Sequence, residues 1–246
     1  CMSFTFNGIN SDDMGLIVER YPSRPFPTRK VDSYSIIGRS GDLLIEQDAW
    51  SNVTQEYEVF ICGNFQQRAQ AIAYWLLNAN GYCELTDSYD TNDTYRMARF
   101  IGGVSFLNAL NKYGRAKITF DCCPQRYPRT PEILSGSWDD TFTLPDHPNM
   151  QKGLPILTIP SLPVNASGII ETDTLRIVIP AQSSLINSVF IDWETQAVGT
   201  LQPNRFVSAV SITGQWLPLG DGDEIRTALE TGDSVPMTVE TRRWYL

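Results

Sequence analysis

Hydrophobic and polar residues alternate along most of this chain, in short runs separated by turn-forming residues. A period of two places successive side chains on opposite faces of a β-strand. The segments 53–62 and 115–122 keep this period throughout. We expect their alternate positions to face the core: Val53, Gln55, Tyr57, Val59 and Ile61 in the first, and Ala116, Ile118, Phe120 and Cys122 in the second. The pattern is typical of a mainly β protein.

Two strand–turn–strand patterns lie in the first fifty residues. The apolar runs 4–6 and 14–18 are joined through an Asn-Gly pair, which favours a tight turn. Residues 34–37 and 43–45 lie on either side of a glycine-containing turn. Both patterns predict β-hairpins.

One segment breaks the period of two and predicts a helix. Asn64 can cap its N-terminus, and Gly81 lies where a C-terminal glycine belongs. Its apolar positions step by four, three and four residues along one face: Phe65, Ala69, Ile72 and Leu76. Trp75 widens this stripe.

A proline-rich segment, 124–131, separates two β-rich halves, because proline interrupts strand pairing and stiffens a connection. We place the domain boundary near residue 135. Beyond it, apolar runs predict strands at 156–159, 175–179, 189–193, 206–212 and 235–240. The predicted fold class is mainly β: an N-terminal β-sandwich-like domain with one α-helix and hairpin extensions (residues 2–135), and a C-terminal β-sandwich of the jelly-roll or galectin-like kind (residues 136–246).

Composition narrows the class of protein. The 246 residues are 42% hydrophobic and 19% charged, with a formal net charge of -9. Wrapping a phosphate backbone needs clustered Lys and Arg, whereas an acidic surface can face DNA without binding it. The chain has no run of about 18 apolar residues and no basic-then-apolar start, so we expect neither membrane insertion nor export. Cys1 precedes Met2, and we expect it to be a remnant of cloning or processing.

Enzymatic chemistry has few candidates. The one histidine, His147, lies in a turn-forming loop, and no nucleophile signature accompanies it. Acidic groups that could serve a glycosidase are an open alternative: Asp139 with Asp140, Asp192 with Glu194, and Asp221 and Asp223 with Glu224. Any acidic β protein carries such groups in its turns, so we expect no catalytic residues and no enzyme.

The sequence also gives little evidence for a metal-binding site. Carboxylates cluster at Asp87, Asp90 and Asp93 and again at 221–224, without the spacing of an EF-hand calcium loop. Four cysteines lack C-x-x-C spacing and lie in strand-like runs, as buried reduced thiols do: Cys62, Cys83, Cys122 and Cys123. We expect no metal and no cofactor.

The aromatic residues leave a binding function open. Six tryptophans on an acidic β protein could stack on sugar rings. Trp75 belongs to the helix stripe and Trp193 to a strand-like run, which favours packing for both. Trp50, Trp138 and Trp216 are the candidate exposed rings.

The first half of the chain carries its motifs in a particular order. An aromatic strand and hairpin (4–8, then 15–18) come first, and the glycine-bounded turn 38–41 follows. A helix then ends in Trp-Leu at 75–76, and a strand runs into a Cys-Pro element and a tyrosine over 118–127. This order resembles the N-terminal domain of the distal tail proteins of siphophages, the Dit family.

The second half is similar to the C-terminal domain of the same family. It opens with the Pro-x-Ile-like strand 155–159, continues with a strand ending in Ile-Asp at 190–192, and then carries the Leu-Pro-Leu and glycine turn 217–225. The end of the chain, 242–246, is an Arg-Trp strand. The sequence departs from the family at 223–224, where an Asn-containing turn is usual. The resemblance covers almost the whole chain.

The resemblance implies a structural protein of the virion, at the tail tip, folded and assembled in the bacterial host cytoplasm. Such proteins form a homo-hexameric ring through the N-terminal domain. The ring joins the major tail tube protein to the tail-associated fibre or lysin protein, with the tape measure protein as a further candidate partner. DNA passes through the lumen without specific binding.

Candidate subunit-interface residues follow from this interpretation: the turn Arg39, Ser40, Gly41 and Asp42, and Trp75 on the helix. Asp87 and Asp93 are candidate lumen acids. The alternative function is a carbohydrate-binding or host-receptor-contact module of a phage or bacterial surface protein.

Overall fold

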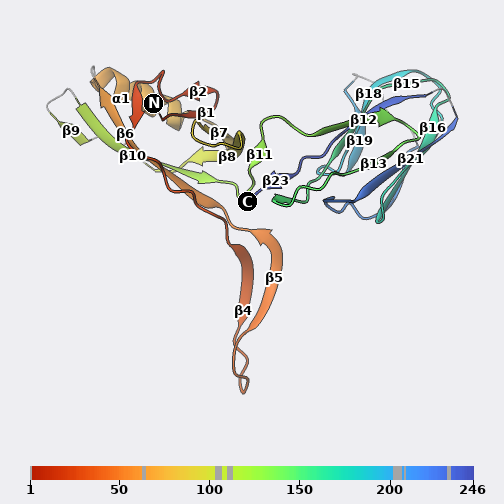
Figure 1. The fold of residues 1–246 in the computed structure, drawn as a ribbon, viewed down its shortest axis with the longest axis horizontal. Coiled ribbons are helices and arrows are strands. Elements are labelled where there is room, and N and C mark those ends of the chain that lie inside the picture. The colour runs from red at the N-terminus through yellow and green to blue at the C-terminus, as the bar shows by residue number, and fades with distance from the viewer. Residues whose placement is uncertain are drawn as a thin grey trace. The chain divides into compact units, whose positions relative to one another are not determined.

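The computed structural model describes residues 2–62, 65–102, 107–109, 113–201, 207, 209–231 and 234–246. The chain divides into two compact units, Cys1–Arg129 together with Leu246, and Thr130–Tyr245. The division falls within the proline-rich segment 124–131. Each unit has its own hydrophobic core, and both are built mainly of β-strands (Figure 1).

The first unit is built on a nine-stranded antiparallel sheet in the order β2-β1-β7-β8-β10-β6-β3, with β11 paired to β8 and β9 paired to β10. A separate two-stranded sheet, β4-β5, belongs to the same unit. The elements are β1 (Phe4–Phe6), β2 (Ile9–Asn10), β3 (Leu16–Val18), β4 (Arg29–Tyr34), β5 (Leu43–Trp50), β6 (Val53–Cys62), α1 (Phe65–Leu77), β7 (Cys83–Asp87), β8 (Thr94–Phe100), β9 (Leu107–Ala109), β10 (Tyr113–Cys122) and β11 (Tyr127–Pro128).

Alternation along β6 and β10 decides which of their side chains are buried. All five positions predicted to face inwards from β6 are buried: Val53, Gln55, Tyr57, Val59 and Ile61. In β10 the prediction is confirmed for Ile118, Phe120 and Cys122, whereas Ala116 is half-buried at the margin of the core. The period of two therefore specifies the core face of both strands.

Helix α1 contributes its apolar stripe to the same core. Ile72, Trp75 and Leu76 are buried. The predicted capping residue Asn64 lies outside the described residues, and Gly81, predicted to end the helix, lies beyond its last residue, Leu77. The helix therefore ends before the glycine is reached.

Aromatic rings form the centre of this core. Phe4 stacks on Tyr57 with ring centroids 4.4 Å apart, and Phe6 lies 4.8 Å from Phe120. The indole Nε1 of Trp75 donates a hydrogen bond of 3.1 Å to the carbonyl oxygen of Phe6. That bond satisfies the polar atom of a buried ring and ties α1 to β1.

The second unit contains two five-stranded antiparallel sheets, β12-β22-β15-β18-β19 and β13-β21-β16-β17-β20, and a short pair, β14-β23. Its elements are β12 (Ile133–Ser137), β13 (Thr141–Thr143), β14 (Met150–Gln151), β15 (Ile156–Leu162), β16 (Ser167–Glu171), β17 (Leu175–Ile179), β18 (Ile186–Asp192), β19 (Ala197–Thr200), β20 (Ser211–Gly214), β21 (Glu224–Thr231), β22 (Pro236–Glu240) and β23 (Trp244–Tyr245). Strand β20 occupies only the end of the strand predicted at 206–212, part of which lies outside the described residues.

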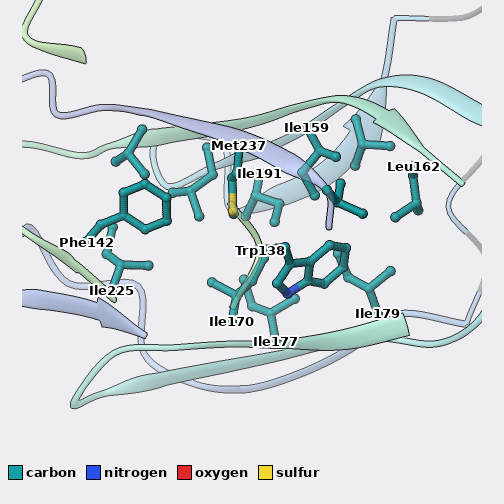
Figure 2. Close-up of a cluster of buried hydrophobic side chains, with 14 of the residues drawn as sticks. Trp138, Phe142, Ile159, Leu162, Ile170, Ile177, Ile179, Ile191, Ile225 and Met237 are labelled. Carbon is teal, nitrogen blue, oxygen red and sulfur yellow. The ribbon is translucent and has the colours of Figure 1, made fainter. Parts of the chain in front are cut away.

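The core of the second unit lies between its two five-stranded sheets. Figure 2 shows Ile159, Ile191 and Met237 from one sheet and Ile170 and Ile177 from the other, gathered in one apolar layer. All five side chains are buried. Burial of each aliphatic side chain of this size stabilises the fold by about 1.5–3 kcal/mol. This unit is a β-sandwich, and the predicted fold class is confirmed.

Candidate assembly interface

Strands β4 and β5 form a hairpin that extends away from the nine-stranded sheet of the first unit (Figure 1). We call residues 29–50 the arm. Its two strands pair antiparallel from Tyr34 opposite Leu43 down to Arg29 opposite Trp50, with an irregularity near the base. Neither strand pairs with any other strand of the described residues. The arm is therefore a two-stranded ribbon with open edges.

Apolar side chains lie on both faces of the arm. Residues that are directly opposite in an antiparallel pair share a face. One face carries Val31 and Leu44, and the other carries Tyr34, Leu43 and Ile45. All five are exposed, Leu44 by 64%. Each face of the arm therefore presents a surface that a partner could cover.

The tip of the arm is apolar as well. Ile36 is exposed, and the side chain of Ile37 is completely so, at 103%. The backbone N–H of Arg39 donates 3.1 Å to the carbonyl of Ile36, which closes the turn. Gly38 and Gly41 have φ of +84° and +85°, a left-handed conformation that glycine adopts without strain. The turn is locally determined and presents isoleucine to solvent.

Polar contacts hold the arm in shape. Near the tip, the hydroxyl of Ser33 donates 2.9 Å to the carboxylate of Asp42. Near the base, Arg29 lies 3.2 Å from Glu46 and stacks over the ring of Trp50 at 5.0 Å. Such exposed contacts contribute little individually. They fix the geometry of the ribbon and leave its apolar residues uncovered.

The interface candidates predicted from the sequence are Arg39 to Asp42 and Trp75. The turn residues are exposed at the tip of the arm. Trp75 is only 5% exposed and belongs to the core. Its part in an interface stays a prediction, as does that of the turn.

An apolar groove lies beside Trp75, with a cavity volume of about 670 Å³. Helix α1 contributes Ala71, Tyr74 and Trp75, strand β2 contributes Ile9, and the connection between β2 and β3 contributes Met14. Tyr74 is 72% exposed and stands off the buried stripe of the helix. Sequence reasoning missed this groove, and an aromatic residue outside the apolar stripe was the signal that could have found it.

The architecture of this chain is similar to that of a solved protein structure. The chain is similar to the crystal structure of the SPP1 Dit protein, described as a paradigm of hub adsorption apparatus in phages that infect Gram-positive bacteria, with a TM-score of 0.72, 13% sequence identity and 99% of both chains covered. The chain has the Dit fold. Two structures of the phage P2 baseplate in its activated conformation, with Ca and with Sr, align at a TM-score of 0.46, 9% identity and 98% coverage of both chains.

The resemblance drawn from the order of motifs is thus confirmed at the level of the fold. No protein-family model matches the chain. No curated protein matches it significantly in sequence. The Dit fold is therefore recognised here through its three-dimensional arrangement of strands.

The carboxylates that suggested a glycosidase or a calcium loop are held by other groups within this Dit fold. Some accept hydrogen bonds: Asp140 from the backbone N–H of Ser137, Asp192 from the hydroxyl of Thr195, and Asp87 from the hydroxyl of Tyr57. Others form ion pairs: Glu194 with Arg242, Asp221 with Arg243, Asp223 with Lys152, Glu224 with Arg226, Asp90 with Arg24, and Asp93 with Arg129. Among the described residues, no three His, Cys, Asp or Glu side chains are grouped as a metal site. Their geometry is that of structural pairs and turns.

His147 belongs to an ionic cluster of the second unit, built around the buried Arg243. The Nε2 of His147 lies 3.0 Å from Oε1 of Glu132. The other carboxylate oxygen of Glu132 accepts a hydrogen bond of 2.6 Å from Nη2 of Arg243. Arg243 is 1% exposed and reaches Asp221 at 2.8 Å. The pKa of Glu132 is lowered by its hydrogen bonds and by the charge of Arg243, against the opposing effect of burial. The cluster ties the C-terminal residues to the start of the sandwich.

The thiol of Cys122 and the three candidate tryptophan rings pack against other parts of the protein. Burial raises the pKa of Cys122 to about 12, so this thiol is neutral. Trp138 was named as a candidate exposed ring, and that is wrong: the residue is 1% exposed and its ring lies in the sandwich core (Figure 2). Trp50 is half-buried under Arg29, and Trp216 is half-buried with its ring edge-on to Trp193 at 5.0 Å.

In the described part of the chain, no helix is both long and apolar enough to cross a membrane.

Of the two candidate lumen acids, Asp87 accepts a hydrogen bond from the hydroxyl of buried Tyr57, which does not fit a lumen-facing role. Asp93 has a 74% exposed side chain and is compatible with that role.

Proposed function

We propose that this chain is a structural protein of a phage tail tip, a distal tail protein that assembles as a hexameric ring through its first unit. The ring would join the tail tube to the tail-associated fibre or lysin protein. The Dit fold over the whole chain supports this proposal, and the arm carries it. No enzymatic step is part of the function.

The arm supports assembly because its open strand edges and exposed apolar residues are surfaces that another molecule can cover. An isolated two-stranded hairpin is marginal, and open strand edges invite pairing with another chain. Covering each exposed Leu or Ile of the arm contributes up to about 1.5–3 kcal/mol. Contiguous exposed apolar surface of this kind marks sites of interaction with other molecules.

The partner we propose is a second copy of this chain. The arm tip carries Ile36 and Ile37, and the groove beside α1 is lined by Ala71 and Tyr74. Seating the tip of one copy in the groove of the next is a head-to-tail contact. Contacts of this kind generate rings when the rotation closes.

The net charge supports passage of DNA through such a ring. At -9 the chain is acidic, and like charge keeps a phosphate backbone from binding to the wall. Asp93 is the candidate that we retain for the lumen surface.

The test is the solution mass by light scattering, combined with negative-stain images, of the wild type and two variants. We expect rings, or stacked pairs of rings, for the wild type. Ile45→Asp on the arm should give monomers, because the aspartate would have to be buried without a partner. Leu185→Asp is the matched control, since Ile45 and Leu185 are both 49% exposed and only the first lies on the arm. A wild-type monomer at every concentration would contradict the proposal.

A further inference from the structure

The segment 20–28 joins strand β3 to the base of the arm, and we call it the strap. It contains Pro22, Pro25 and Pro27, which lack the backbone N–H that a strand ladder needs. The strap accordingly forms neither strand nor helix. Proline-rich segments of this kind are extended and stiff, because proline fixes φ. The direction in which the strap runs along the sheet is therefore passed on to the arm.

Side chains of the sheet, rather than backbone pairing, hold the middle of the strap. The amide of Gln55 donates 3.1 Å to the carbonyl of Ser23, and the Nη2 of Arg96 donates 3.2 Å to the carbonyl of Pro25. Among the described residues, the strap makes a backbone–backbone hydrogen bond only at its end, where the carbonyl of Thr28 accepts from the N–H of Ser51. The strap can therefore leave the sheet without breaking a strand ladder.

The two donors are unusual residues for their positions. Gln55 of β6 and Arg96 of β8 face inwards and are 2% and 5% exposed, where alternation ordinarily places apolar side chains. Burying such polar groups is unfavourable unless they are hydrogen-bonded. Each reaches a carbonyl of the strap, and the Nε and Nη1 of Arg96 have no partner of their own. We therefore interpret these two side chains as a seat for the strap.

An ion pair adds a third contact to this seat. Arg24 of the strap lies 2.6 Å from Asp90, whose side chain is only 4% exposed. Burial acts to raise the pKa of Asp90, but hydrogen bonds from Thr94 and Asn92 and the charges of Arg126 and Arg24 lower it overall. The carboxylate is therefore ionised at neutral pH. A charge-assisted hydrogen bond to a buried, prepositioned carboxylate is stronger than one between exposed side chains.

The arm has two connections to the sheet, and they differ. Strand β5 runs into β6 through Ser51 and Asn52 alone, whereas β4 is reached through the whole strap. A two-residue connection keeps the arm attached but leaves its backbone free to rotate. The seating of the strap supplies the second point that fixes a direction.

We propose that Gln55, Arg96 and Asp90 act as positioning residues, which hold the strap and thereby set the direction of the arm. Release of the strap lets the arm turn about residues 51–52 while both hydrophobic cores stay folded. The apolar residues of the arm are then no longer aimed at their place on a neighbouring copy. This consequence for assembly rests on the function proposed above, whereas the seating of the strap does not.

Trypsin cleavage after Arg20 in the dilute monomer measures the seating. Residues 21–24 must leave the sheet to enter the protease, and the rate follows the population of the open form. We expect Arg24→Gln to raise the initial rate by about tenfold, and Arg24→Lys, which keeps the charge, to restore most of the wild-type rate. The Tm of Arg24→Gln should fall by no more than about 2–4 °C, because Arg24 belongs to neither core.

Arg99→Gln is the matched control. Like Arg24, Arg99 is an exposed arginine paired with a less exposed aspartate: it lies 2.9 Å from Asp121 on the strands of the sheet and makes no contact with the strap. This variant should be cleaved after Arg20 at the wild-type rate. A wild-type rate for Arg24→Gln would overturn the proposal, and so would an equal increase in both variants, which would mean a general loosening of the sheet.

Light scattering on the same variants tests the positioning role. Arg24→Gln should assemble only at about tenfold higher concentration than the wild type, and Arg24→Lys should recover most of the loss. Faster cleavage together with wild-type assembly would overturn the positioning role. A wild type that stays monomeric would instead contradict the proposed function, while the cleavage rates would still decide whether Arg24 seats the strap.

Discussion

The arm and the sandwich strand β17 are made of the same kinds of residue, yet their surroundings are opposite. Residues 43–45 of the arm are Leu-Leu-Ile and all exposed, whereas Ile177 and Ile179 of β17 are completely buried. Strand β17 pairs with β16 on one edge and β20 on the other, and the second sheet covers its face. Among the described residues, each strand of the arm pairs only with the other, and the apolar side chains on both faces remain exposed. An apolar run in the sequence indicates residues that become buried. Whether they are buried within the chain or upon assembly can be seen only in the tertiary structure.

This difference separates folding from assembly. The sandwich gains its stability from contacts that the chain makes with itself. The arm gains almost nothing from its apolar residues until another molecule covers them, because hydrophobic stabilisation follows the area removed from water. Truncations in the two regions should therefore be detected by different measurements.

The largest effect on folding is expected for Trp138→Ala. The ring fills the centre of the sandwich, and removing it should lower the free energy of unfolding by about 3–5 kcal/mol. Tyr34→Ala on the arm removes a large ring that is 52% exposed, and should change the free energy of unfolding of the dilute monomer by less than about 0.5 kcal/mol. Urea unfolding below the assembly concentration measures both. A loss of similar size for Tyr34→Ala would mean that the arm is covered within its own chain.

Much of the fold could be predicted from the sequence because it is local. The period of two placed the core face of β6 and β10, and a period near 3.6 placed α1. The Gly-rich turn between the two strands of the arm was also recognised, because Gly38 and Gly41 determine it within a few residues. The strand before it lies at Arg29–Tyr34 and not at 34–37. The predicted hairpin between 4–6 and 14–18 is wrong, because β1 pairs with β2 and β3 pairs with β6. The exposure of the arm was not predicted, since Leu43 to Ile45 reads equally well as a buried strand.

Features that depend on contacts between residues far apart in the chain could not be predicted from the sequence. Trp138 lies among serines and aspartates in the sequence, but its ring packs against Gly168, where any Cβ would lie within about 3 Å of the ring. Arg96 lies on the inward face of an alternating strand, which is an anomaly in the period of two. It lines a small polar cavity together with Arg126, and this proximity of two distant residues arises only when the chain folds.

The next largest effect is expected on assembly, from a double-mutant cycle between arm and groove. Ile37→Asp places a charge at the arm tip, and Ala71→Arg fills the groove. Each should weaken assembly by about tenfold or more, equivalent to at least about 1.4 kcal/mol for each contact. If the tip of one copy seats in the groove of the next, the two losses should not add, because the second change acts on a contact already broken.

Analytical ultracentrifugation over a concentration series measures this coupling. Partial recovery of assembly in the double variant would agree with the proposed contact, since the aspartate would then meet the introduced arginine. Strictly additive losses would separate the two surfaces, and the arm would have to seat elsewhere on the neighbouring copy.

The smallest effect is expected for Gly41→Ala at the tip of the arm. Gly41 has φ of +85° and no atom within 4 Å of the position of a Cβ, so alanine adds backbone strain of about 1 kcal/mol and no clash. The strain should disorder the turn that presents Ile37 and weaken assembly by about fivefold. Gly222→Ala is the matched control in the sandwich, with φ of +72° and equally open space. It should lower the free energy of unfolding by a similar amount and leave assembly unchanged. If both variants impair assembly alike, the preformed tip is not what the arm contributes.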